Sequence, residues 1–249
     1  MMNPLQRLLL LSIVGFLMQA SACQSNDDGV GFDKIADKGT SSTTNNPSQP
    51  QQNNDQPPAI DPAKEERLVS QRAQVEQEAL KSVGKSCVKD LDCTLYLRCI
   101  QDACAVPPAV DGADTSEAPV VVVTTASGEA QFAMELALDI PQRSRGLMFR
   151  PRMSDEWSML FVYDREQSDL SFWMKNTLIP LDMLFINDAG EVVGVVENAE
   201  PLTLTSRGIP GTRSRYVLEI NAGLAKRFGI AAGDKVQFVR LADEHLPRR

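Results

Sequence analysis

Three polar residues, Lys175, Asn176 and Asp182, interrupt the apolar stretch SFWMKNTLIPLDMLFI at residues 171–186. Glu219 lies in a second apolar run, YVLEI. A charged side chain in a protein core costs several kcal/mol unless a cation or several hydrogen-bond donors compensate it. The two carboxylates could therefore serve acid–base catalysis, bind a ligand, or belong to a buried network that fixes strand register.

We expect these polar residues to meet at one mouth of a β-rich domain. In a strand over residues 170–177, Trp173 and Lys175 would face one side and Asn176 the other. Arg145 is a candidate cation because it adjoins Gly146, where the backbone can be approached closely. The expected cluster contains Arg145, Lys175, Asn176, Asp182 and Glu219, with Trp173 as an apolar wall. The other arginines of this run, Arg143, Arg150 and Arg152, are expected on the solvated surface.

Several kinds of chemistry are excluded by residue content. The one histidine of the chain, His245, is the fifth residue from the C-terminal end, which removes histidine-based nucleophilic schemes and histidine-rich zinc sites. All five cysteines lie at or before residue 104, and no glycine-rich phosphate loop follows a strand. The methionines of the C-terminal half could bind copper but are better explained as core. We therefore predict no metal and no cofactor.

The N-terminus has the pattern of a secretory signal. Residues 1–7 carry a basic charge, residues 8–18 are apolar, and Ala20, Ser21 and Ala22 precede Cys23. The sequence ASAC resembles a bacterial lipobox, which implies cleavage after residue 22 and lipidation of Cys23; an ordinary signal peptide is the alternative. Gln24 after the cysteine suggests the outer membrane. We expect a lipid-anchored protein of the bacterial cell envelope, with the membrane as its partner.

Composition divides the remaining chain into segments. Residues 23–60 are rich in Ser, Thr, Asn, Gln and Pro and predict a disordered tether. Residues 61–84 predict a helix, with Asp61 as its N-cap and Pro62 in its first turn; it is either a solvated spacer or a partner-binding helix. A linker at 107–117 and a tail at 242–249 flank the C-terminal domain. The net charge of −8 argues against nucleic acid as a partner.

Residues 85–106 contain four cysteines, Cys87, Cys93, Cys99 and Cys104. They could bind zinc, but their spacing differs from the paired C-x2-4-C pattern of structural zinc sites. Outside the cytoplasm disulfides are the default, and so short a segment needs covalent support. Of the three possible pairings we favour Cys87–Cys99 with Cys93–Cys104.

Residues 118–241 predict a compact, mainly antiparallel β sandwich or barrel with two short helices. A hairpin is expected around Ser127-Gly128, with Phe132, Met134, Leu136 and Leu138 on one face of its second strand. Further strands are expected at 158–163, 170–177, 181–187, 192–197, 214–220 and 235–240. The helices are expected at 141–148 and 222–228, the second capped by Asn221 and ended by Gly229.

Five sequence blocks in this order resemble the family of domain of unknown function 192: RGLMFR, SMLFVYD, SFWMKNTLIPLDMLFIN, GEVVGVVENAEP and RYVLEINAGLAKRFGIAAGDKV. The resemblance covers residues 118–241 and implies a compact β-rich domain, with no established activity. We expect a membrane-anchored binding or accessory module for a small molecule or envelope ligand. The alternatives are a hydrolase of envelope glycans that uses Asp182 and Glu219, and a structural envelope protein without a cleft.

Overall fold

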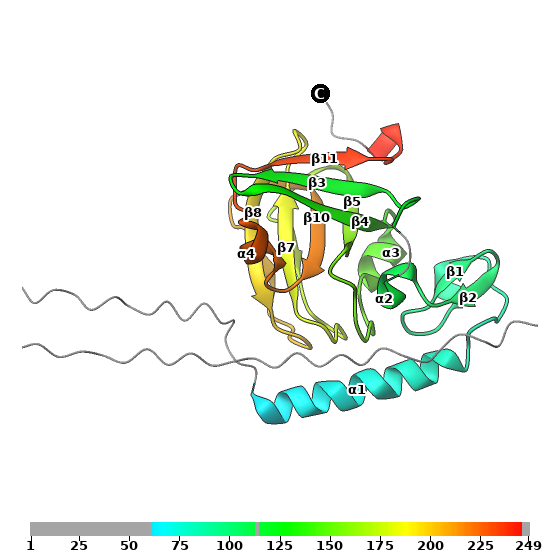
Figure 1. The fold of residues 1–249 in the computed structure, drawn as a ribbon. Coiled ribbons are helices and arrows are strands. Elements are labelled where there is room, and N and C mark those ends of the chain that lie inside the picture. The colour runs from blue at the N-terminus through cyan, green and yellow to red at the C-terminus, as the bar shows by residue number, and fades with distance from the viewer. Residues whose placement is uncertain (1–60, 113–114, 246–249) are drawn as a thin grey trace, which may run out of the picture. The chain divides into compact units, whose positions relative to one another are not determined.

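The computed structural model describes residues 61–112 and 115–245, and its centre is a curled seven-stranded sheet (Figure 1). In spatial order the strands are β11 (Lys235–Val239), β3 (Val120–Thr125), β4 (Gly128–Ala137), β5 (Trp157–Ser168), β10 (Arg213–Asn221), β7 (Leu181–Ile186) and β8 (Val192–Ala199). At one end of the sheet, Val192 N–H donates to the Asp234 carbonyl at 2.9 Å, and Val236 N–H donates to the Gly190 carbonyl at 2.8 Å. These bonds join the two edges of the sheet, so the fold is a half-barrel of the predicted β class.

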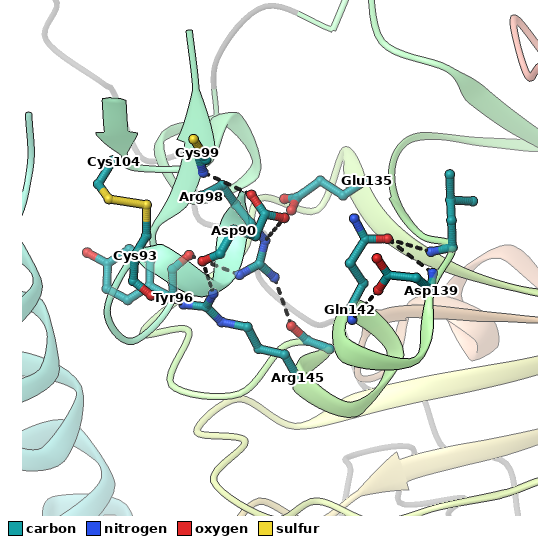
Figure 2. Close-up of polar contacts among 12 residues, drawn as sticks. Asp90, Cys93, Tyr96, Arg98, Cys99, Cys104, Glu135, Asp139, Gln142 and Arg145 are labelled. Carbon is teal, nitrogen blue, oxygen red and sulfur yellow. Dashed lines mark hydrogen bonds and ion pairs between the residues drawn. A yellow bond between two sulfur atoms is a disulfide. The ribbon is translucent and has the colours of Figure 1, made fainter. Parts of the chain in front are cut away.

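All neighbouring strands are antiparallel except β4 and β5, which are parallel. The crossover between them contains α3 (Ile140–Arg145), which starts one residue before the predicted helix. A capping box between Asp139 and Gln142 fixes this start, since each side chain accepts a hydrogen bond from the other's backbone N–H (Figure 2). The parallel pair was not expected, and it places α3 and the loop that follows it over one face of β5.

The sheet has a core on each face. The first core contains Phe132 and Met134, with Leu136 and Leu138 packed against it, so the predicted face of β4 is confirmed. The second core contains Phe161 and Phe185. Burial on both faces explains why β5, β7 and β10 are apolar along most of their length.

The second short helix, α4 (Leu224–Phe228), is bounded by two glycines in left-handed conformation, Gly223 with φ of 85° and Gly229 with φ of 68°. Gly229 ends the helix as expected. The prediction that Asn221 caps it was wrong, because its side-chain amide donates to the Met153 carbonyl at 2.8 Å. The N-cap residue of α4 is Gly223, two residues after Asn221.

The four-cysteine segment has the favoured pairing, Cys87–Cys99 and Cys93–Cys104. It consists of η1 (Asp90–Asp92), β1 (Arg98–Ile100) and β2 (Ala103–Ala105), followed by α2 (Pro108–Asp111). Tyr96 and Leu97 are buried at its centre. The segment therefore has a small core in addition to its disulfides.

Helix α1 (Pro62–Leu80) begins as predicted, with the Asp61 carboxylate accepting from Ala63 N–H at 3.1 Å. It ends four residues before the expected boundary. Leu68 and Ala79 are buried, and the Arg72 guanidinium donates to the Leu178 carbonyl at 2.8 and 3.0 Å. The helix is therefore in contact with the chain beyond it and is not only a solvated spacer. No helix in the described ranges is long and apolar enough to cross a membrane.

The described residues also include β6 (Ser171–Phe172), which pairs with β9 (Arg207–Gly208), and η2 (Asp243–His245). The predicted signal peptide, Cys23 and the whole predicted tether at residues 23–60 lie outside the described residues.

Candidate functional site

The two carboxylates singled out in the sequence lie on opposite faces of the sheet. In the pairing of β10 with β7, Glu219 is opposite Met183 and Ile220 is opposite Asp182. Cross-strand partners share a face and successive residues alternate between faces. Asp182 therefore shares the face of Ile220, in the first core, while Glu219 shares that of Met183, in the second. The expected single cluster is divided, and the facing pair of carboxylates that a glycan hydrolase needs is not formed.

Asp182 is fully buried and holds the chain on both sides of it. Its carboxylate accepts hydrogen bonds from Asn198 N–H at 2.8 Å and Ala225 N–H at 2.9 Å. Burial raises the pKa of Asp182, and backbone N–H groups, including that of Gly223, oppose this rise. The residue connects β7 to β8 and to the first turn of α4. Its role is structural, because its hydrogen-bonding capacity is used by the backbone.

Glu219 is also buried, with 4% of its surface exposed, but it has no such partners. No residue in the described part of the chain forms a hydrogen bond or salt bridge with its carboxyl group. Burial raises the pKa of Glu219 to about 8, against the opposing charge of Arg150. At neutral pH the group is therefore mostly a carboxylic acid, which can both donate and accept a hydrogen bond.

Glu219 lines a cavity of about 370 Å³, a volume at the lower end of the range for small-molecule sites. Its walls come from α3 and the residues after it, from β5 and β6, and from the loop after β6. Aromatic rings form much of the lining: Phe161, Tyr163, Phe172 and Trp173. Trp173 is 52% exposed, which is unusual for an indole that is not covered by a partner. The expectation that Trp173 lies beside a pocket agrees with this lining.

Arg143 lines the same cavity and is not a solvated surface residue, contrary to expectation. Its guanidinium lies 4.8 Å from the centre of the Tyr163 ring. One terminal nitrogen, Nη1, donates to the carbonyls of Leu138 and Val162. In the described part of the chain, Nε and Nη2 donate to no protein acceptor. The side chain is thus fixed in position while part of its hydrogen-bonding capacity is free.

Arg145 is directed towards the four-cysteine segment (Figure 2) and not into the expected cluster. Its guanidinium donates to the carbonyl of Asp90 at 2.6 Å, to that of Cys93 at 3.1 Å, and to that of Leu95. Arg98 reinforces the contact by donating to the Gly146 carbonyl at 3.0 Å. The disulfide-bonded segment is therefore attached to the residues that form one wall of the cavity.

Close packing at Gly146 supports the expectation of near backbone approach. A Cβ atom there would lie 3.0 Å from the Phe161 ring, and the φ of 46° also disfavours a side chain.

Lys175 and Asn176 lie in a loop, so the prediction of a strand over residues 170–177 was wrong beyond Phe172. The chain turns here because Asn176 adopts a φ of 55°, and its carbonyl accepts from Phe149 N–H at 2.7 Å. Lys175 lies 5.2 Å from the centre of the Trp173 ring, with which it makes a cation–π contact. In the part of the chain that the structure describes, neither side chain forms a hydrogen bond or ion pair with Asp182 or Glu219.

The charged pair with the greatest burial was missed. The expectation that Arg150 lies on the solvated surface was wrong, because Arg150 is fully buried and makes two hydrogen bonds to Glu135, at 2.6 and 2.8 Å. Burial acts to raise the pKa of Glu135, but the charges of Arg150 and Arg98 and the bonds from Arg150 hold it below its ordinary value. Glu135 could have been recognised because it shares a strand face with the small residues Ala133 and Ala137. Such a position demands a cation, and Arg150 supplies it.

In the described ranges, the group with metal-ligand geometry consists of the sulfur atoms of Cys87, Cys93 and Cys104. All three belong to disulfides, which agrees with the choice of disulfides over zinc.

Comparison with known proteins identifies a family for the sheet domain. Residues 121–238 match the family model DUF192, described as Uncharacterized ACR. The C-terminal half carries a DUF192 domain. This domain contains β3 to β11 and the cavity beside Glu219, while the four-cysteine segment lies before the matched residues.

Two crystal structures are similar to the DUF192 domain of this chain. A protein from Sinorhizobium meliloti 1021, named a "putative transcription regulator", is 40% identical over 48% of this chain and 92% of that chain, with a TM-score of 0.46. A protein of unknown function from Novosphingobium aromaticivorans DSM 12444 is 36% identical over 53% of this chain and 99% of that chain, also with a TM-score of 0.46. No curated protein matches the chain.

Proposed function

We propose that this protein is a membrane-anchored, extracytoplasmic module that binds a small molecule in the cavity of its DUF192 domain. The supporting observation is Glu219, a buried carboxyl group that has no partner within the described ranges and lines a cavity of about 370 Å³. A structural residue in this position would be expected to have its hydrogen bonds satisfied, as Asp182 has. A group without partners beside aromatic walls is instead typical of a binding site. A purely structural envelope protein would not need this cavity.

Two methionines provide internal reporters for the binding test. Met148 lines the cavity, whereas Met134 lies in the first core on the opposite face of the sheet. In the disulfide-bonded mature protein with labelled methionine methyl groups, a mixture of envelope small molecules is expected to shift the NMR signal of Met148 and leave that of Met134 in place. Equal shifts of both signals, or no shift at all, would contradict a binding site in this cavity.

The anchor is proposed from the sequence ASAC, in which Cys23 is the lipidated residue. The tether that follows would present the folded part of the chain away from the lipid surface. Cys23→Ala is expected to move the protein from the membrane fraction to the soluble fraction, because the acyl chains supply the membrane affinity. The distribution is measured by fractionation and immunoblotting. Unchanged membrane retention of the variant would contradict the proposal.

A further inference from the structure

The cavity beside Glu219 has a mixture of groups that restricts the ligand it can take. Its charged lining residues are Arg143, Arg145 and Glu219, that is, two cations and one acid. The Arg145 guanidinium is occupied by carbonyl groups of the four-cysteine segment. Towards the described residues, Arg143 has unused donors and Glu219 makes no hydrogen bond through its carboxyl group. A ligand in the cavity would therefore form its hydrogen bonds with these two residues.

We propose that the cavity binds a small organic acid as its carboxylate anion, with the Glu219 carboxyl group as hydrogen-bond donor and the Arg143 guanidinium as the compensating charge. This proposal rests on the proposed binding function and adds the chemical class of the ligand. A carboxylate is a good acceptor for both groups, and its hydrogen bonds to them are charge-assisted. The apolar part of the ligand would lie against Phe161, Phe172 and Trp173, which line the same cavity.

The charges around the cavity favour an anion over a cation. Arg143 and Arg145 are on α3, Arg150 is in the loop after it, and Lys175 lies beside Trp173. Tyr163 faces the site from β5, and its pKa is raised by burial and by Glu219, with Arg143 opposing. An ammonium ligand would need the ionised form of Glu219 and would approach these cations. A carboxylate ligand uses the acid form, which burial already favours.

Benzoate, benzamide and benzylammonium test the proposal, since they share a ring and differ in charge. We expect benzoate to shift the Met148 signal at millimolar concentration and to bind more tightly than the other two. Its affinity should be constant between about pH 6 and about pH 8, where benzoate is ionised and Glu219 is protonated. It should fall about tenfold per pH unit above pH 8, because Glu219 then loses its proton. E219Q should bind benzoate without this fall, since an amide keeps a donor and does not titrate. E219M should bind benzoate more weakly than E219Q at every pH, because a methionine side chain donates no hydrogen bond.

Arg143 has a matched control in Arg152, an exposed arginine that does not line the cavity. R143Q is expected to weaken benzoate binding at least tenfold, and R152Q to leave it unchanged. If R143Q does not fold, the pH dependence of benzoate affinity in wild type and E219Q still tests the proposal. Tighter binding of benzylammonium, no binding of benzoate, or a benzoate affinity independent of pH would overturn the proposal. If benzamide or benzylammonium shifted the Met148 signal and benzoate did not, the proposed ligand class would be wrong. The proposed binding function of the cavity would still hold.

Discussion

Asp182 and Glu219 are buried carboxyl groups on opposite faces of the sheet, and they have opposite surroundings. Asp182 accepts hydrogen bonds from the backbone of β8 and α4 at 2.8 and 2.9 Å. Glu219 is also buried, yet it has no partner among the described residues and borders a cavity. Burial raises the pKa of both groups, so burial alone does not distinguish them. The difference lies in the donors, which the fold supplies on one face and leaves for a ligand on the other.

The largest expected effect concerns the pH dependence of stability. The pKa of Glu219 is about 8 in the folded protein and 4.5 ordinarily, so folding favours its protonated form. This contribution to stability is complete below pH 4.5 and is lost as pH rises through 8, by about 5 kcal/mol in all. E219Q is therefore expected to lose less stability than wild type between these limits in denaturant titrations. Parallel pH profiles for the two proteins would show that Glu219 is charged or solvated.

The next effect concerns the buried pair behind Glu219. Arg150→Met is expected to destabilise the protein by about 4 kcal/mol, because it leaves Glu135 buried without its cation. It should also raise the pKa of Glu219 further, since the charge of Arg150 opposes that rise. Chemical denaturation gives the first quantity, and NMR titration of the glutamate carboxyl carbon gives the second. If Arg150→Met were stable and the pKa of Glu219 were unchanged, Arg150 would not influence Glu219 as proposed.

Asp182→Ala should cost about 3 kcal/mol, because the backbone N–H groups of Asn198 and Ala225 lose their acceptor. Asp182→Asn keeps one acceptor oxygen and is expected to cost less. E219Q at neutral pH is the comparison on the other face and should not destabilise the protein, since no bond to a described residue is lost and the amide does not titrate. A thermal melt unaltered by Asp182→Ala would mean that these bonds contribute nothing.

The smallest effect concerns the attachment of the four-cysteine segment. Arg145→Ala removes the guanidinium that donates to Asp90, Cys93 and Leu95 and should cost about 2 kcal/mol. It should also increase hydrogen exchange in the segment. Arg152→Ala, which removes exposed ion pairs only, is expected to change stability by about 0.5 kcal/mol or less. Equal effects of the two substitutions would argue against a specific role of Arg145.

The sequence predicted local structure well where one rule governs it. Alternation in β4 identified the face of Phe132 and Met134, and the glycine at 229 marked the end of α4. It failed where tertiary contacts override the local pattern. Residues 173–177 were read as strand, but the chain turns there around Asn176, whose carbonyl bonds to Phe149 from a distant loop. The buried Arg150 was missed because its partner Glu135 lies 15 residues earlier.

Sequence alone determined which residues need a partner. Apolar neighbours along the chain indicate that the carboxyl groups of Asp182 and Glu219 are buried, and the number and spacing of the cysteines indicate a disulfide framework. The assignment of partners was decided by the tertiary structure. A one-residue offset between β10 and β7 places the two carboxylates on opposite faces, since side chains alternate along a strand. Strand register depends on two paired segments. A local sequence pattern therefore cannot predict which carboxyl group, Asp182 or Glu219, lies near hydrogen-bond donors. The packing of α4 supplied them to Asp182, and the crossover through α3 left a cavity beside Glu219.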